Sequence, residues 1–367
     1  MRRQISSIVM IIIVAIFGGY IFVWGGSDIL HTWAGKVFFP GLAFLNDSKK
    51  EFNIVETMVE QLLPLYQYVN VNAPNNVKVE DSLTYEMLLA EQARDEERIS
   101  EDLADASTAQ VANVDLSIEK LRDFNYLLSK FYTVDSTTTI NASQLNADDL
   151  LARSMKIDQN TSGPKVLIFH THSQEAFADS KPGDVSTTIV GMGKYLSEQL
   201  NALGIETLHH DGVYDLINGK LDRSKAYQQA EVGVKELLNQ YPSIEVIIDL
   251  HRDGVPESTH LVTEIEGKQV AKIMYFNGLC RTKSNGDLTS MPNPYIQDNL
   301  ALSLQMQLES EKLYSGFTRR IYLKGYRYNM HLMPKSLLIE AGAQTNTVEE
   351  IKNAMDLLAK ILSKVLL

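Results

Sequence analysis

The sequence contains a single cysteine, Cys280, among its 367 residues. An intramolecular disulfide is therefore impossible, and so is a zinc site built from several thiolates. A lone cysteine is usually a small, buried apolar side chain rather than a nucleophile, and we expect this role for Cys280. Chemistry that depends on paired cysteines is excluded.

The sequence also lacks an excess of basic residues. It holds 34 Lys and Arg against 46 Asp and Glu, which gives a formal net charge of −12. Proteins that bind nucleic acids need a basic face, so the acidic balance argues against this class of function, and we expect no nucleic-acid partner. Most of the negative charge comes from residues 79–115, which contain eleven acids and two arginines. We expect this segment to form a solvated helix followed by a flexible acidic linker.

Charge is missing altogether from residues 5–24. About 20 helical residues at ~1.5 Å each span the ~30 Å apolar core of a bilayer. Arg2 and Arg3 precede this run, and positive charge stays on the cytoplasmic side. No small-residue cleavage site follows directly, which argues against a cleaved signal peptide. We therefore predict a cytoplasmic tail at 1–4, a single-pass cell-membrane anchor at 5–24, and an extracytoplasmic remainder.

The rest of the chain divides into a stalk, a lead-in and a larger domain. Residues 25–116 form the expected extracytoplasmic stalk with its acidic spacer. Residues 117–156 form a helical lead-in, with one helix over 117–133 that begins at Ser117. Residues 157–367 form the predicted catalytic domain.

In this domain, apolar β-branched runs alternate with segments of helical periodicity. Such alternation predicts an α/β fold with a mostly parallel sheet flanked by helices. The predicted strands cover 166–170, 205–209, 244–250, 270–276 and 336–340. The predicted helices cover 189–203, 227–240, 299–313 and 348–366.

Histidines and carboxylates stand at the ends of three of these strands. His170, His172 and Glu175 follow the first strand, His251 follows the strand at 244–250, and Glu340 ends the last one. In open α/β sheets, ligands bind beyond the carboxyl ends of the strands. Two or three histidines with a carboxylate are the ligands of a catalytic zinc ion, which keeps one position open for water. The sequence therefore predicts a metal-dependent hydrolase.

The spacing suggests a role for each residue. His172 and Glu175 lie three residues apart, so one turn can present both to one zinc ion (Zn²⁺), and His251 would be the third ligand. Glu340 would take the proton of the attacking water and pass it to the leaving amine. His170 shares its predicted strand face with His172, so it could be a ligand instead, or a contact of the ligands or substrate.

The remaining polar candidates have less context. Arg252 could bind a carboxylate of the substrate and Asp253 could orient a ligand, although a surface salt bridge between them is equally compatible with the sequence. His331 shortly precedes the Glu340 strand and could line the cleft. Three further histidines of this domain are expected at the surface: His209, His210 and His260.

Several segments resemble one known family. They are VLIFHTHSQEAF (166–177), IIDLHRDGV (247–255), PNPYIQDNLALSLQ (292–305) and RYNMHLMPKSLLIEAGAQTNTVEE (327–350), preceded by FYTVDSTTTI (131–140). In this order they are similar to the stage II sporulation protein P family. The resemblance covers about 117–367 and the single N-terminal anchor.

This resemblance implies an exported hydrolase that cuts peptidoglycan while the forespore is engulfed during sporulation. Family members are zinc-dependent N-acetylmuramoyl-L-alanine amidases, and some are also described as endopeptidases. They act with sporulation protein D, a glycan-strand transglycosylase, and sporulation protein M, a membrane scaffold. The resemblance implies an amidase fold of the zinc type in the catalytic domain.

When the functional positions of the family are transferred to this sequence, the metal ligands correspond to His172, Glu175 and His251. The catalytic acid corresponds to Glu340. One departure concerns Glu175. In the wider amidase group the glutamate ligand usually lies farther along the chain, on a following helix, and Glu198 is the alternative here.

Overall fold

The computed structural model describes residues 114–367. The predicted anchor at 5–24 and nearly all of the predicted stalk lie outside these residues. Within 114–367, no helix is long and apolar enough to cross a membrane.

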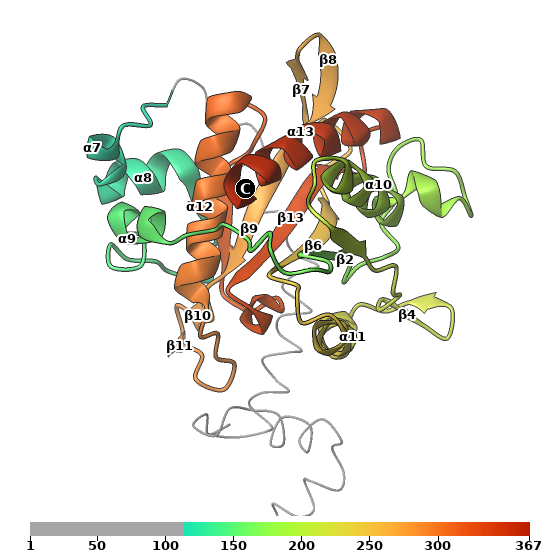
Figure 1. Cartoon of the computed structure of the whole chain (residues 1–367), viewed down its shortest axis with the longest axis horizontal. Helices are drawn as coiled ribbons and strands as arrows, with labels where there is room; N and C mark the ends of the chain where they lie inside the picture. The colour runs from blue at the N-terminus through green and yellow to red at the C-terminus, as the bar shows by residue number, and fades with distance from the viewer. Residues whose placement is uncertain (1–113) are drawn as a thin grey trace, which may run out of the picture. The chain divides into compact units, whose positions relative to one another are not determined.

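A seven-stranded sheet forms the centre of the described part (Figure 1). Its strand order is β1-β12-β9-β13-β6-β2-β3, and five of the six neighbouring pairs are parallel. The exception is the antiparallel pair of β9 and β13. The predicted α/β fold with a mostly parallel sheet is therefore confirmed. In the same order, the strands are Tyr132–Val134, Ile321–Lys324, Ile273–Gly278, Lys335–Ala343, Val246–Asp253, Val166–Phe169 and Thr207–His209.

The antiparallel pair divides the sheet into two halves of opposite direction. Strands β13, β6, β2 and β3 run one way, and β9, β12 and β1 run the other. The carboxyl ends of β2, β6 and β13 consequently meet at one edge, as the predicted site requires. The amino end of β9 starts at that edge too, because Ile273 pairs with Ala341.

Helices cover both faces of the sheet. Helices α10 (Ile189–Ala202), α12 (Ile296–Leu313) and α13 (Val348–Leu366) pack on one face, which is turned toward the viewer in Figure 1. Helix α11 (Ala226–Gln240) packs on the other. Side chains alternate along a strand, so Val166 and Ile168 of β2 join the larger core while Leu167 and Phe169 join the core under α11.

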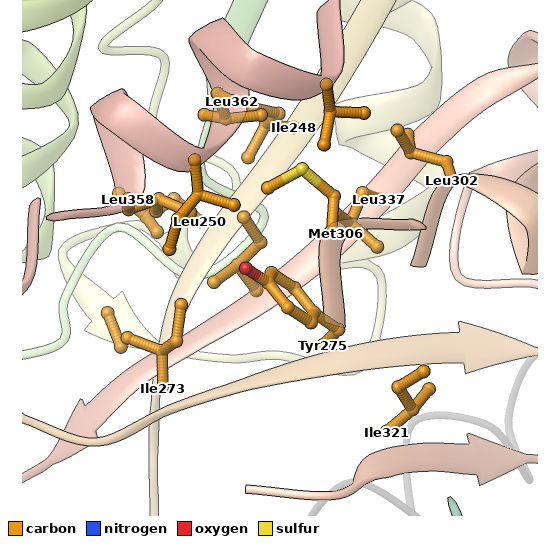
Figure 2. Packing of buried hydrophobic residues seen from close by; sticks show 14 of the residues in the cluster. Ile248, Leu250, Ile273, Tyr275, Leu302, Met306, Ile321, Leu337, Leu358 and Leu362 are labelled. Atoms are coloured by element: carbon orange, nitrogen blue, oxygen red, sulfur yellow. The ribbon is translucent and has the colours of Figure 1, made fainter. Parts of the chain in front are cut away.

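The larger core is built from strands and helices far apart in the chain. Figure 2 shows Leu250 of β6, Tyr275 of β9, Met306 of α12 and Leu358 of α13 gathered in one cluster. Burying an apolar side chain of this size contributes about 1.5–3 kcal/mol. The hydroxyl of Tyr275 has a hydrogen-bond partner within this core, because its Oη lies 2.9 Å from Ser310 Oγ.

The lead-in is less regular than predicted. The prediction of a single helix over 117–133 is wrong, because the structure has two helices there, α7 (Ile118–Leu121) and α8 (Phe124–Phe131). Asp123 separates them, and its side chain accepts hydrogen bonds from the first backbone N–H groups of α8. Such a cap starts a new helix rather than continuing the old one. Helix α9 (Ala147–Ala152) follows and packs on α12.

Short hairpins and turns complete the fold. The predicted strand 270–276 is interrupted, because its first residues belong to the hairpin of β7 and β8, which turns at Glu266 and Gly267 with positive φ. The hairpin strands are β7 (Val262–Ile265) and β8 (Lys268–Ala271), β4 (Leu216–Ile217) and β5 (Lys220–Leu221), and β10 (Arg281–Thr282) and β11 (Gly286–Asp287). Two 3₁₀ turns, η2 and η3, cover Val185–Thr187 and Met330–Leu332.

Candidate metal centre

Three of the predicted site residues lie together at the expected edge of the sheet. Ligand atoms of His172, Glu175 and His251 all lie within 4.8 Å of one another, and all three residues are buried. Glu175 Oε1 is 3.5 Å from His172 Nδ1 and 3.8 Å from His251 Nδ1. The two imidazole rings meet edge to face, with centroids 4.9 Å apart.

Two buried carboxylates hold the turn that carries His172. Thr171 donates from its backbone N–H to Asp249 Oδ1 at 2.9 Å and from its hydroxyl to Asp249 Oδ2 at 2.6 Å. Ser173 donates from its hydroxyl to Asp215 Oδ1 at 2.6 Å, and Gln174 donates from its backbone N–H to Asp215 Oδ2 at 3.1 Å. The turn after β2 is thereby fixed on both sides of His172.

Glu175 lies among positive charges and hydrogen-bond donors. The backbone N–H of Arg252 donates to Glu175 Oε2 at 2.8 Å, and Arg223 Nη2 lies 3.4 Å from Oε1. Burial alone would raise the pKa of Glu175, but hydrogen bonds and charges of His172 and His251 outweigh it and lower that pKa well below its ordinary value. Glu175 is therefore ionised near neutral pH.

His251 stands between two carboxylates. Its Nδ1 faces Glu175, and its Nε2 lies 2.8 Å from Asp249 Oδ1, although the N–H bond is not aligned with that oxygen. Burial lowers the pKa of His251, but Asp249 and Glu175 outweigh burial and raise it well above its ordinary value. The surroundings of the imidazole therefore favour positive charge, which a bound cation on the Nδ1 side would also supply.

Glu340 lies next to His251 on the neighbouring strand, because the two are register partners in the parallel pair of β13 and β6. Its side chain is buried, and among the described residues its Oε2 has no hydrogen-bond partner. Burial, together with the charge of Asp253, raises the pKa of Glu340 to about 8. A buried, unpartnered carboxyl group is costly, so its presence beside the histidines indicates a chemical use.

Arg252 and Asp253 do not form the surface salt bridge considered from sequence. Asp253 is fully buried and pairs with Arg319, whose Nη1 lies 2.6 Å from Asp253 Oδ2. Arg252 instead donates from Nε to the carbonyl of Ala176 and from Nη1 to the carbonyl of Asp253, both at 3.0 Å. These contacts tie the ends of the two ligand-bearing segments together.

His170 points away from the three-residue group. Its Nδ1 lies 2.7 Å from the carbonyl oxygen of Leu250, and its Nε2 lies 3.0 Å from Nε2 of His209. Strand β2 ends at Phe169, so the alternation that placed His170 and His172 on one face does not continue to His172. A Cβ added at Gly193 of α10 would lie 2.4 Å from His170 Nε2, so this helix approaches the ring closely.

The other histidines differ in part from the prediction of surface positions. His209 is half-buried against His170, and burial lowers the pKa of both to about 4. His210 Nε2 contacts Tyr214 Oη at 2.7 Å, and the half-exposed His260 pairs with Glu350 at 2.9 Å. His331 is partly buried and lies 3.3 Å from Glu231 of α11 rather than in the metal group.

Sequence reasoning missed the residues that support the site. Asp249 could have been found, because it lies two residues before His251 on the same strand and therefore faces the same side. Arg223 and Tyr227 had no such signal. Tyr227 lies on α11, and its ring meets that of His172 edge to face with centroids 5.8 Å apart. Glu198, the alternative ligand, is exposed on α10, outside the group.

The donor set fits a zinc ion. Two imidazole nitrogens and one carboxylate oxygen are the three protein ligands of many catalytic zinc sites. Glu175 is ionised, and the surroundings of His251 favour positive charge, so the group suits a cation. The unpartnered oxygen of Glu340 adds an acceptor close to the place where such an ion would bind.

The comparison with protein families agrees with the motifs. The family model described as Stage II sporulation protein P matches residues 50–363. The chain belongs to the stage II sporulation protein P family. The resemblance inferred from the sequence is therefore confirmed. The chain is 25% identical over 223 residues to stage II sporulation protein P of Bacillus subtilis (strain 168), covering 56% of this chain and 52% of that protein. It thus spans about half the length of that relative.

Solved amidase structures also resemble the chain at low similarity. Amidase AmiC2 of Nostoc punctiforme is 13% identical with a TM-score of 0.33, covering 56% of this chain and 96% of that one. The CwlD amidase of Clostridioides difficile, solved in complex with the GerS lipoprotein, is 17% identical with a TM-score of 0.33, covering 55% and 99%.

Proposed function

We propose that this chain is a zinc-dependent peptidoglycan hydrolase of sporulation, with N-acetylmuramoyl-L-alanine amidase activity. The observation that carries the proposal is the buried group of His172, Glu175 and His251 with the buried carboxyl of Glu340 beside it, whose Oε2 has no hydrogen-bond partner in the described part of the chain. Membership of the stage II sporulation protein P family supports the sporulation role and peptidoglycan as the substrate.

In this proposal His172, Glu175 and His251 hold the ion. A bound zinc ion would supply Lewis acidity, which activates water and polarises the amide carbonyl. Glu340 accepts a proton from the attacking water and delivers it to the leaving nitrogen as the C–N bond breaks. Burial raises the pKa of Glu340 above its ordinary value, so this carboxyl group holds a proton more readily than an exposed one and can pass it to the leaving nitrogen. The products are a lactyl carboxylate on the glycan and a peptide with a free amino group.

Two alternatives to the amidase function need a direct test. The same residues could hydrolyse a bond between amino acids, as in a peptidoglycan endopeptidase or carboxypeptidase, because both reactions are amide hydrolyses. A non-catalytic protein that binds the wall as a scaffold is the other alternative. The complete set of three ligand residues and Glu340 favours an enzyme over a scaffold.

We further propose that residues 5–24 anchor the chain in the cell membrane, with a cytoplasmic N-terminus and the catalytic domain outside, at the engulfing membrane. Sporulation proteins D and M are the proposed partners, as the family resemblance implies. Co-purification from sporulating cells with a tagged chain tests the partners, and cysteine labelling of intact cells at positions before and after the run tests the topology.

The reaction is tested by digesting purified peptidoglycan with the zinc-loaded full-length chain and identifying soluble products by mass spectrometry. Free stem peptides that begin with L-alanine would support the amidase. Shortened peptides still attached to glycan would favour the peptidase. No product, with sporulation proteins D and M also supplied, would favour the scaffold.

The role of Glu340 gives the first prediction. Glu340→Gln should retain zinc but lose at least about 100-fold in turnover, because proton transfer by a positioned side chain contributes about 10²–10⁴-fold. Bound zinc is measured by elemental analysis and turnover by release of stem peptides. Loss of zinc from this variant would instead make Glu340 a ligand.

A further inference from the structure

We propose that Asp249 is the positioning residue of the metal centre, where its one carboxylate orients the imidazole of His251 and also holds the turn that carries His172. This inference rests on the proposed metal site. It assigns Asp249 a function beyond filling the interior of the sheet.

The contact with His251 determines which ring nitrogen faces the ion. Asp249 and His251 lie two residues apart on β6, so their side chains leave the same face of the sheet. Asp249 Oδ1 is 2.8 Å from Nε2, whereas Nδ1 faces Glu175 at 3.8 Å. The N–H of Nε2 is not aligned with this oxygen, but the negative charge of a carboxylate so close favours a proton on Nε2 and leaves the lone pair on Nδ1 for a cation. Histidine ligands commonly have such a partner at their second nitrogen.

The contacts with Thr171 extend the effect to the other histidine ligand. Asp249 accepts both the backbone N–H and the hydroxyl of Thr171, at 2.9 and 2.6 Å. Thr171 directly precedes His172, so these bonds limit where the His172 ring can lie. Two segments that are 80 residues apart in the chain, around 171 and 251, are thus joined through one buried carboxylate.

A matched control is available in the same turn. Asp215 is also fully buried, and it likewise accepts a hydroxyl and a backbone N–H, from Ser173 and Gln174. Among its described contacts, none is to a ligand histidine. Asp215→Asn therefore disturbs the turn as Asp249→Asn does, without removing the charge beside His251.

The experiment measures zinc affinity of the full-length chain by competition with a chromophoric chelator, using zinc alone as the probe. Asp249→Asn should weaken zinc binding about 10- to 100-fold, as loss of such a partner typically does. Asp215→Asn, which disturbs the turn but spares the contact with His251, should lose clearly less affinity than Asp249→Asn, and Asp249→Glu, which keeps the carboxylate, should bind more tightly than Asp249→Asn. Ring ¹⁵N shifts of zinc-loaded protein should show His251 bound through Nδ1 and protonated at Nε2.

Equal losses of affinity in Asp249→Asn and Asp215→Asn, or zinc on Nε2 of His251, would overturn the role of Asp249. If Asp249→Asn does not fold, Thr171→Val and Asp249→Glu carry the test. Thr171→Val spares the contact with His251 and should lose less affinity than Asp249→Glu, in which that contact is displaced. The reverse order would overturn the proposal. A wild-type chain that binds no zinc would instead overturn the metal site itself.

Discussion

At the scale of single residues, the most consequential structural interaction beside the site is the ion pair of Asp253 and Arg319. Both side chains are almost completely buried, and their closest atoms are 2.6 Å apart. Removing one member of a buried pair leaves an uncompensated charge, which costs about 3–5 kcal/mol. The pair therefore holds the end of β6 in place, and breaking it should strongly lower the free energy of unfolding.

This reasoning predicts that Arg319→Met lowers the free energy of unfolding by about 3–5 kcal/mol. The control is Arg122→Met, which removes a pair with Asp148 whose two side chains are 56% and 52% exposed. Solvent screens such exposed pairs, so this one contributes little to stability. Urea unfolding of both variants makes the comparison, and similar losses in the two would contradict the assigned importance of burial.

Glu311 of α12 predicts a pH dependence of stability away from the site. Burial raises its pKa from 4.5 to about 6, despite a hydrogen bond from Thr318 at 3.2 Å. The unfolded chain therefore loses this proton at lower pH than the folded chain does. The contribution of Glu311 to stability is present below pH 4.5 and is lost as the pH rises through 6.

Glu311→Gln should remove this loss, because glutamine has no proton to release and keeps an acceptor for Thr318. Relative to the wild type, the variant should gain up to about 2 kcal/mol between pH 4 and pH 7, since one pKa unit corresponds to about 1.36 kcal/mol. Urea unfolding at several pH values measures the difference. A pH-independent difference would show that the carboxyl group does not titrate as inferred.

At the scale of elements, α13 has the clearest start signal in the described chain. Thr347 accepts a hydrogen bond from the backbone N–H of Glu350, and Glu350 accepts one from the backbone N–H of Thr347. This capping box satisfies two backbone groups that the helix itself leaves unpaired. It explains why the helix predicted over 348–366 begins where the structure has it.

Thr347→Ala should accordingly cost about 1 kcal/mol of stability. Thr188 is the control, because it occupies the same position before α10 but its side chain makes no cap hydrogen bond. Thr188→Ala should cost clearly less than Thr347→Ala when both are measured by thermal unfolding. Equal costs would mean that the residue type, rather than the observed bonds, determines the effect.

The long elements and the main site residues were predictable from sequence, for related reasons. The helix at 348–366 keeps the hydrophobic period of a helix over its whole length. The site residues His172, Glu175, His251 and Glu340 lie at or just after the ends of predicted strands. Strands β1 and β12 were not predicted. Strand β1 begins inside the run assigned to the helix over 117–133, and β12 contains only one β-branched residue, Ile321.

The orientation of His170 was not predictable from the pattern alone. It depends on where β2 ends, and strand boundaries are set by tertiary hydrogen bonds rather than by local sequence. The supporting contacts of Arg223 and Tyr227 depend on how α11 docks, which no short motif records.

At the scale of the whole described molecule, the lead-in belongs to the same folded unit as the predicted domain at 157–367. Strand β1 pairs with β12 at the sheet edge, and Leu127, Phe131 and Leu150 are fully buried in the larger core. Removing residues 114–156 would expose these contacts and open the edge of β12.

We therefore predict that a fragment of residues 114–367 folds cooperatively, whereas a fragment of 157–367 aggregates or unfolds at much lower temperature. Circular dichroism and size-exclusion chromatography of the two fragments test this expectation. A soluble, cooperatively folded 157–367 fragment would show that the lead-in is an accessory to the domain.

The pairing of His251 with Glu340 on adjacent central strands also has a dynamic consequence. Glu340 has paired strands on both sides and His251 pairs with it, so we expect the backbone amides of these two residues to exchange slowly with solvent. The turn that carries His172 and Glu175 has no such flanking strands. The strand half of the centre is thus held by the sheet, whereas the turn half is held by the bonds to Asp249 and Asp215, so release of an ion would begin where these bonds break.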